Sequence, residues 1–174
     1  MGDRITRVTS SVIHPSKKRG SRSARPYRYT DIFVTVNTQR KPHSESEENA
    51  IYEELENLIE NVMFTEVEIK KILPMDDREA IDEVLMSNLS LETGKKPRGG
   101  RVHAHFILNI VHRTNFRLAI ANQTFKIWFD DHFSWFTGSN GCNVKVILMT
   151  SSKIKNYIAK SGKAPPRQIM ADFQ

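Results

Sequence analysis

Cysteine is nearly absent from this sequence, since Cys142 is the only one among 174 residues. A single cysteine excludes an internal disulfide framework and any zinc site built from several cysteines. The sequence also lacks an apolar run near the roughly 20 residues that a membrane-spanning helix needs, and its N-terminus is basic where a signal peptide would be apolar. We therefore expect one domain with its own hydrophobic core and no membrane partner.

Acidic residues are scarce toward both ends of the chain and concentrated in its middle. Residues 1–42 carry ten Lys/Arg and two Asp/Glu. Residues 43–92 carry three Lys/Arg and fifteen Asp/Glu, and residues 93–174 carry thirteen Lys/Arg and three Asp/Glu. If the two basic segments meet in the fold, they form a surface suited to a polyanion, because neutralised phosphates release counterions. The same distribution also fits a solvated surface that binds nothing.

The spacing of apolar residues predicts strands and helices that interleave along the chain. Ser44 with Glu47 three positions later fits a helix-capping box, and Asn122 is the expected cap of a second helix. Strands are expected over 31–37, 63–73, 84–92, 101–111 and 143–149, and a last helix over 151–162. This order predicts an α+β domain with a central, mainly antiparallel five-stranded sheet and flanking helices.

The strand expected over 101–111 carries two histidines on one face. Side chains alternate between faces with a period of two, so the row from Val102 to Ile110 points into the core while His103 and His105 point to the opposite face. Their backbones lie about 7 Å apart, which lets both imidazoles bind one divalent ion. An isolated H-x-H pattern also fits two ordinary polar residues on an exposed strand.

A carboxylate is expected beside these histidines. The turn over 93–100 favours a β-hairpin that brings Glu92 next to His103, and Glu66 or Glu68 on the strand expected over 63–73 are the alternatives. In the last helix, Tyr157 has Lys160 one turn later and Lys153 one turn earlier. A phenol is a weak nucleophile at neutral pH, and nearby positive charge strengthens it.

Three short blocks together resemble the HUH endonuclease superfamily, in particular the single-tyrosine Rep-type replication initiators of viruses and mobile elements. They are FVTVNTQ at 33–39, VHAHFIL at 102–108 and NYIAKSGK at 156–163, in that order. The resemblance implies a ferredoxin-like or RRM-like HUH fold over residues 29–164, after a basic and flexible arm over 1–28 and before a tail or linker over 165–174.

The resemblance also implies a reaction. Mg²⁺ or Mn²⁺, bound by His103, His105 and Glu92, would polarise a phosphate of single-stranded DNA, and Tyr157 would attack it with assistance from Lys160. The expected activity is site-specific nicking and joining through a 5′-phosphotyrosine link, which initiates rolling-circle or rolling-hairpin replication or transposition. No second tyrosine lies near Tyr157, which disfavours a paired-tyrosine scheme.

The expected partner is single-stranded DNA from an origin or hairpin element. The residues expected to contact it are Thr35, Asn37, Gln39, Arg40, Lys95, Lys96, Arg98, Arg101 and Lys153. A G-x-x-x-x-G-K-[ST] phosphate loop is absent, so unwinding would need a helicase domain or a helicase in trans. The basic stretch from Lys17 to Arg25 suggests import into a host nucleus.

The main alternative is a non-catalytic basic α+β module that binds single-stranded nucleic acid. Phe33, Trp128 or Trp135 would then be the rings on which bases stack. A histidine-triad hydrolase needs a third histidine at position 107, which is Ile107, and a metal-dependent barrel needs about 250 residues. These two enzyme classes are therefore disfavoured.

Overall fold

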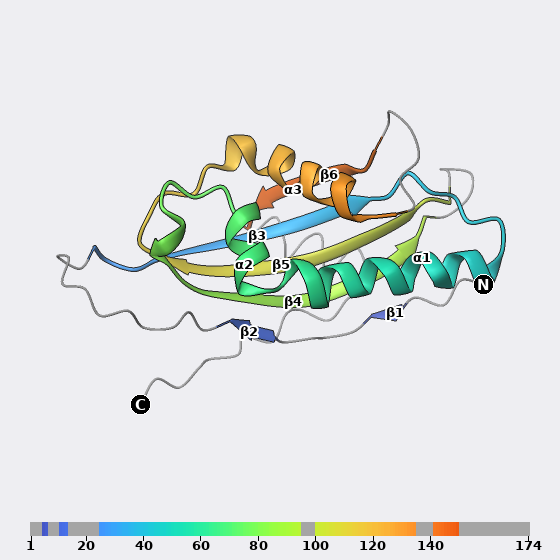
Figure 1. Ribbon diagram of the computed structural model, residues 1–174, viewed down its shortest axis with the longest axis horizontal. Helices are drawn as coiled ribbons and strands as arrows, with labels where there is room; N and C mark the ends of the chain where they lie inside the picture. The colour runs from blue at the N-terminus through green and yellow to red at the C-terminus, as the bar shows by residue number, and fades with distance from the viewer. Residues whose placement is uncertain (1–4, 7–10, 14–24, 95–99, 135–140, 150–174) are drawn as a thin grey trace.

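The protein has an antiparallel sheet covered on one face by helices (Figure 1). The computed structural model describes residues 5–6, 11–13, 25–94, 100–134 and 141–149. Its strands are β1 (Ile5–Thr6), β2 (Ser11–Ile13), β3 (Arg28–Asn37), β4 (Ile81–Thr93), β5 (Val102–His112) and β6 (Asn143–Leu148). Its helices are α1 (Glu45–Asn57), the π-helical turn η1 (Leu58–Met63), α2 (Glu66–Ile72), the 3₁₀ turn η2 (Arg78–Ala80) and α3 (Leu118–His132).

The four long strands form the sheet in the order β4-β5-β3-β6, and every pairing is antiparallel. The short strands β1 and β2 both pair with the outer edge of β4. The strand with the two histidines, β5, therefore lies inside the sheet between β4 and β3. This arrangement gives its side chains neighbours on both sides.

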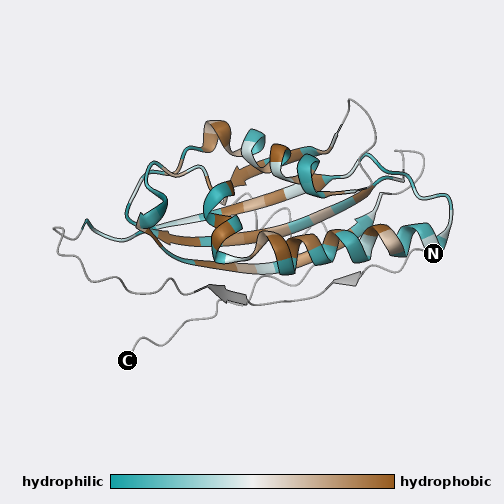
Figure 2. Ribbon diagram, viewed as in Figure 1, coloured by the Kyte–Doolittle hydropathy of each residue, from teal (hydrophilic) through white to brown (hydrophobic). Residues whose placement is uncertain are grey.

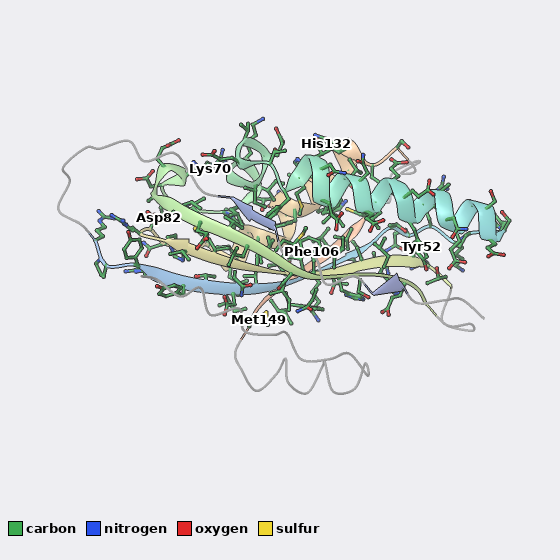
Figure 3. All side chains as sticks on the ribbon, turned by 90° about the horizontal axis from the view of Figure 1, so that it is seen from below. Tyr52, Lys70, Asp82, Phe106, His132 and Met149 are labelled. Atoms are coloured by element: carbon green, nitrogen blue, oxygen red, sulfur yellow. The ribbon has the colours of Figure 1, made fainter. Side chains whose placement is uncertain are left out.

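The hydrophobic core lies between the sheet and the helices. Figure 3 shows α1, α2 and α3 gathered on one side of the sheet, and Figure 2 shows the apolar residues along these elements. Ile32, Val34 and Phe106 are fully buried on the helix-covered face, against a cluster that includes Leu55 and Phe129. Alternation then directs the odd-numbered residues of β3 and β5 to the other face, which carries no helix in the described part of the chain.

Most of the predicted elements are confirmed. The strands expected over 31–37, 84–92, 101–111 and 143–149 correspond to β3, β4, β5 and β6, and the hairpin between β4 and β5 is formed. Ser44 caps α1 by accepting a hydrogen bond from the backbone N–H of Glu47 at 3.1 Å. The α+β class and the antiparallel sheet are therefore as predicted.

The strand predicted over 63–73 is wrong, because residues 66–72 form α2. Thr65 caps this helix by accepting from the backbone N–H of Glu68, and Lys70 pairs with Glu66 one turn earlier at 2.9 Å. These local helix contacts outweigh the strand preference of its β-branched residues. Glu66 and Glu68, the alternative metal ligands, consequently lie on a helix and not on a neighbouring strand.

Two further expectations about element boundaries are corrected. Asn122 does not cap α3, which begins four residues earlier; its side-chain oxygen accepts instead from the backbone N–H of Val146 in β6 at 2.6 Å. Within the arm expected over 1–28, β1 and β2 are paired with β4, although that segment has no strand pattern of its own. The exposed edge of β4 supplies the backbone partners that these short segments need.

A β-bulge in β4 decides which face Glu92 occupies. Ser87 pairs with Ile107 and Ser90 with His105, so two residues of β4 stand opposite one residue of β5. A regular ladder from Ser87 onward would place Glu92 opposite Val102, on the helix-covered face. The extra residue shifts the alternation of β4 by one position, so Glu92 pairs with His103 and lies on the face of the histidines.

Asn88 in this bulge has a φ of 56°, in the left-handed region. A β-branched side chain strongly disfavours that conformation, whereas glycine adopts it freely. We expect Asn88→Val to lower the free energy of unfolding by about 1–2 kcal/mol and Asn88→Gly to change it by less than about 0.5 kcal/mol. Urea denaturation of both variants tests this. Equal decreases in the free energy of unfolding would show that the left-handed conformation at position 88 does not determine the effect of these substitutions.

Candidate metal centre and nucleic-acid face

The β4–β5 hairpin brings the three predicted metal ligands to one face of the sheet. Glu92 is the strand partner of His103, and Ser90 is the partner of His105. One side-chain contact is diagonal, since Nε2 of His105 lies 3.1 Å from Oε1 of Glu92. The His105 side chain is 6% exposed and that of Glu92 is 29% exposed, so solvent reaches this pair from the carboxylate side.

His105 is held in place by two residues of β3. Its Nδ1 lies 3.0 Å from the Thr35 hydroxyl, which belongs to its strand partner. The Phe33 ring stacks on the imidazole with a centroid distance of 5.6 Å and an interplanar angle of 15°. These contacts fix the plane of the ring and direct Nε2 toward Glu92.

His103 lies beside His105, with ring centroids 5.7 Å apart and an interplanar angle of 61°. The backbone of Gly94 closely approaches the ring of His103. A Cβ atom at position 94 would come within 3.2 Å of Cε1 of His103, so a side chain there would need the imidazole to shift by a few tenths of an ångström. The glycine at the start of the predicted turn thus makes room for the second histidine.

The donor atoms of His105 and Glu92 fit a divalent metal ion. Two neighbouring ligands of an octahedral Mg²⁺ with bonds of 2.0–2.1 Å lie roughly 3.0 Å apart, which matches the observed 3.1 Å. Imidazole nitrogen and carboxylate oxygen are both suitable donors for Mn²⁺. Among the described residues, no group of three or more His, Cys, Asp and Glu side chains is already arranged as a metal site. His103 would therefore have to turn toward the other two.

The residues that pair across the strands at these ligands are polar and span four strands. We call this surface the histidine face and define it by two rows of strand partners, Asn143-Asn37-His103-Glu92 and Lys145-Thr35-His105-Ser90. Sequence reasoning missed Ser90, Asn143 and Lys145. The alternation of Asn143 and Lys145 with the buried Val144 and Val146 was the available signal. Only the pairing of β6 with β3 shows that these two residues lie beside Asn37 and Thr35.

The residues predicted to contact DNA fall into four groups. Thr35 and Asn37 lie on the histidine face, and Asn37 also accepts from the backbone N–H of Gln39 at 3.0 Å. Gln39 has a φ of 62°, and the next residue, Arg40, accepts at its carbonyl from the N–H of Val102. Arg101 is exposed immediately before β5. Lys95, Lys96, Arg98 and Lys153 lie outside the described residues.

The described tyrosines are poorly suited to attack at this centre. Tyr52 lies on the helix side, with its hydroxyl 2.7 Å from Thr93 and 3.0 Å from Glu48. Burial raises its pKa to about 12, and the charges of Glu48 and Glu92 act in the same direction. Tyr29 is on the same face as the histidines but six residues before Thr35 in β3, about 20 Å along the strand. Tyr27 precedes β3 and holds its ring against Arg113.

The predicted nucleophile Tyr157 and the lysine three residues later, Lys160, lie outside the described residues. The same is true of Trp135, one of the three rings suggested for base stacking. The other two are buried, with Phe33 8% and Trp128 6% exposed. Trp128 also donates its indole N–H to Glu68 at 3.0 Å. Neither buried ring presents a platform to solvent.

In the described part of the chain, no helix is both long and apolar enough to cross a membrane. Comparisons with protein-family profiles, with curated proteins and with solved structures found no match to this chain.

Proposed function

We propose that this protein is a metal-dependent endonuclease and strand transferase of the HUH type, acting on single-stranded DNA. The observation that carries the proposal is the contact between His105 and Glu92 on the sheet face opposite the helices, with His103 beside them. The sheet order, with helices on one face and the histidine strand inside, is compatible with the ferredoxin-like or RRM-like fold of that superfamily.

In this proposal His105, Glu92 and His103 hold Mg²⁺ or Mn²⁺. The chemistry that a bound ion supplies is polarisation of a phosphate oxygen. The protein itself positions these ligands. Thr35 and Phe33 fix the His105 ring, and the bulge at Asn88 keeps Glu92 on the same face as the histidines.

The covalent step is a transfer between two oxygens on phosphorus. Oη of Tyr157 forms a bond to the scissile phosphorus as the bond to the 3′ oxygen breaks, and the phenol loses a proton while the 3′ oxygen gains one. The products are a 5′-phosphotyrosine and a free 3′-hydroxyl. Because the link retains the energy of the phosphodiester, attack by a 3′-hydroxyl reverses the step and joins strands. Lys160, three residues after Tyr157 in the sequence, would stabilise the charge that develops on these oxygens.

The histidine face offers a path for the DNA backbone. Lys145 is exposed on the edge strand β6, on the same face and in the same row as His105, and Asn37 and Asn143 provide hydrogen-bonding groups in the next row. Phosphate contacts of this kind position a strand without reading its sequence. Binding by the whole chain is expected to weaken with increasing salt because of its net charge of +6.

The experiment that tests the proposal is a search for a covalent protein–DNA adduct. The purified chain is incubated with Mn²⁺ and a library of single-stranded oligonucleotides, and adducts are separated on a denaturing gel. We expect a shifted band that does not form when EDTA is present during the incubation, and sequencing of the attached DNA identifies the target. Tight binding without any adduct across the library would favour the non-catalytic binding module.

A further inference from the structure

Both ring nitrogens of His105 face hydrogen-bonding partners of different kinds. Nδ1 faces the hydroxyl of Thr35 at 3.0 Å, and Nε2 faces the carboxylate of Glu92 at 3.1 Å. An ionised carboxylate only accepts hydrogen bonds, whereas a hydroxyl both donates and accepts. The two partners therefore place different demands on the single proton of a neutral imidazole.

A neutral His105 has one ring hydrogen. With that hydrogen on Nε2, the ring donates to the Glu92 carboxylate, and Nδ1 accepts from the Thr35 hydroxyl. A metal ion on Nε2 needs that nitrogen's lone pair, which moves the hydrogen to Nδ1. The Thr35 hydroxyl must then accept where it had donated. In this exchange the ring loses one proton to solvent at Nε2 and takes up one at Nδ1.

We propose that Thr35 is a positioning residue whose hydroxyl reverses its hydrogen bond, so that His105 keeps a partner in both the Glu92-bound and the metal-bound tautomer. This inference rests on the proposed metal site and adds to it a residue that does not touch the ion. A backbone carbonyl or a carboxylate in the place of this hydroxyl would serve only one of the two tautomers. Thr35 is β-branched and therefore has a restricted χ1, which favours a fixed position for the hydroxyl.

A second threonine–histidine pair on the same two strands gives a matched control. The Thr30 hydroxyl lies 2.8 Å from Nε2 of His112, and Nδ1 of His112 lies 2.8 Å from the backbone carbonyl of Thr114. The carbonyl only accepts, so His112 keeps its hydrogen on Nδ1 and Thr30 donates to Nε2. This pair has the same chemistry as Thr35 and His105 but has no carboxylate or predicted metal ligand at the other nitrogen.

The first test reads the tautomers directly by nitrogen-15 NMR of the labelled full chain. Without metal, we expect His105 to carry its hydrogen on Nε2 and His112 on Nδ1. Addition of Mg²⁺ should move the His105 hydrogen to Nδ1 and leave His112 unchanged. A metal-free His105 with its hydrogen on Nδ1, or a His105 that keeps its Nε2 hydrogen when Mg²⁺ binds, would overturn the inference.

The second test measures Mg²⁺ affinity by calorimetry in three variants. Thr35→Val keeps the side-chain shape and removes the hydroxyl, and we expect its dissociation constant to rise by about tenfold or more. Thr35→Ser restores the hydroxyl and should stay within about threefold of wild type, as should Thr30→Val. Equal affinities of Thr35→Val and wild type would refute the proposed role of Thr35 and leave the proposed metal site standing. No Mg²⁺ binding by the wild type would instead contradict the proposed metal site itself.

Discussion

Replacing Tyr157 with phenylalanine is expected to abolish the covalent adduct while single-stranded DNA binding stays within about twofold of wild type. The substitution removes one oxygen atom and keeps the ring. Loss of the nucleophile lowers turnover by several orders of magnitude in enzymes that form a covalent intermediate, so we expect a decrease of more than about 1,000-fold. The measurements are adduct formation on a denaturing gel and binding by fluorescence anisotropy.

Tyr52→Phe is the matched control for this experiment. It also removes one phenolic oxygen, but that oxygen lies on the helix side of the sheet, bonded to Glu48 and Thr93. Because burial raises the pKa of Tyr52 to about 12, its phenolate is scarce at neutral pH. We expect Tyr52→Phe to keep adduct formation and to lose some thermal stability. Adduct formation by Tyr157→Phe at the wild-type rate, or mapping of the attached nucleotide to another tyrosine by mass spectrometry, would contradict the assignment of Tyr157.

Local patterns predicted the long strands well because each has a strong apolar alternation. In β5 this alternation also predicted that His103 and His105 share a face, and the short turn after Glu92 predicted the hairpin. The pairing of Glu92 with His103 followed from the sequence, but the contact of Glu92 with His105 did not. That contact depends on side-chain orientation, which sequence spacing alone does not specify.

The features that sequence reasoning missed have both local and long-range causes. The segment from Glu66 to Ile72 alternates like a strand, yet the cap at Thr65 makes it a helix. The apolar pattern of β4 changes phase between Met86 and Leu89, and this change was the signal for a bulge. Thr35 was predicted to contact DNA, but its contact with His105 required the register of β3 with β5.

The second large effect is expected for Glu92→Ala, which should lower Mn²⁺ affinity and raise the Mn²⁺ concentration needed for half-maximal adduct formation, each by at least about tenfold. The substitution removes the oxygen that lies 3.1 Å from Nε2 of His105, leaving two imidazoles as the only protein ligands of the proposed site. Two neutral nitrogens are a poor donor set for a hard cation that prefers oxygen. Manganese electron paramagnetic resonance measures the affinity without depending on activity.

Glu66→Ala is the control that makes this experiment decisive. It also removes one carboxylate, but one that pairs with Lys70 on the surface of α2. Because both variants change the net charge equally, a general electrostatic effect on Mn²⁺ would alter both titrations alike. We expect only Glu92→Ala to shift them, while DNA binding without metal stays similar in the two proteins. Identical Mn²⁺ titrations of Glu92→Ala and wild type would remove Glu92 from the site and leave the two histidines in need of another oxygen ligand, from outside the described residues or from the DNA phosphate.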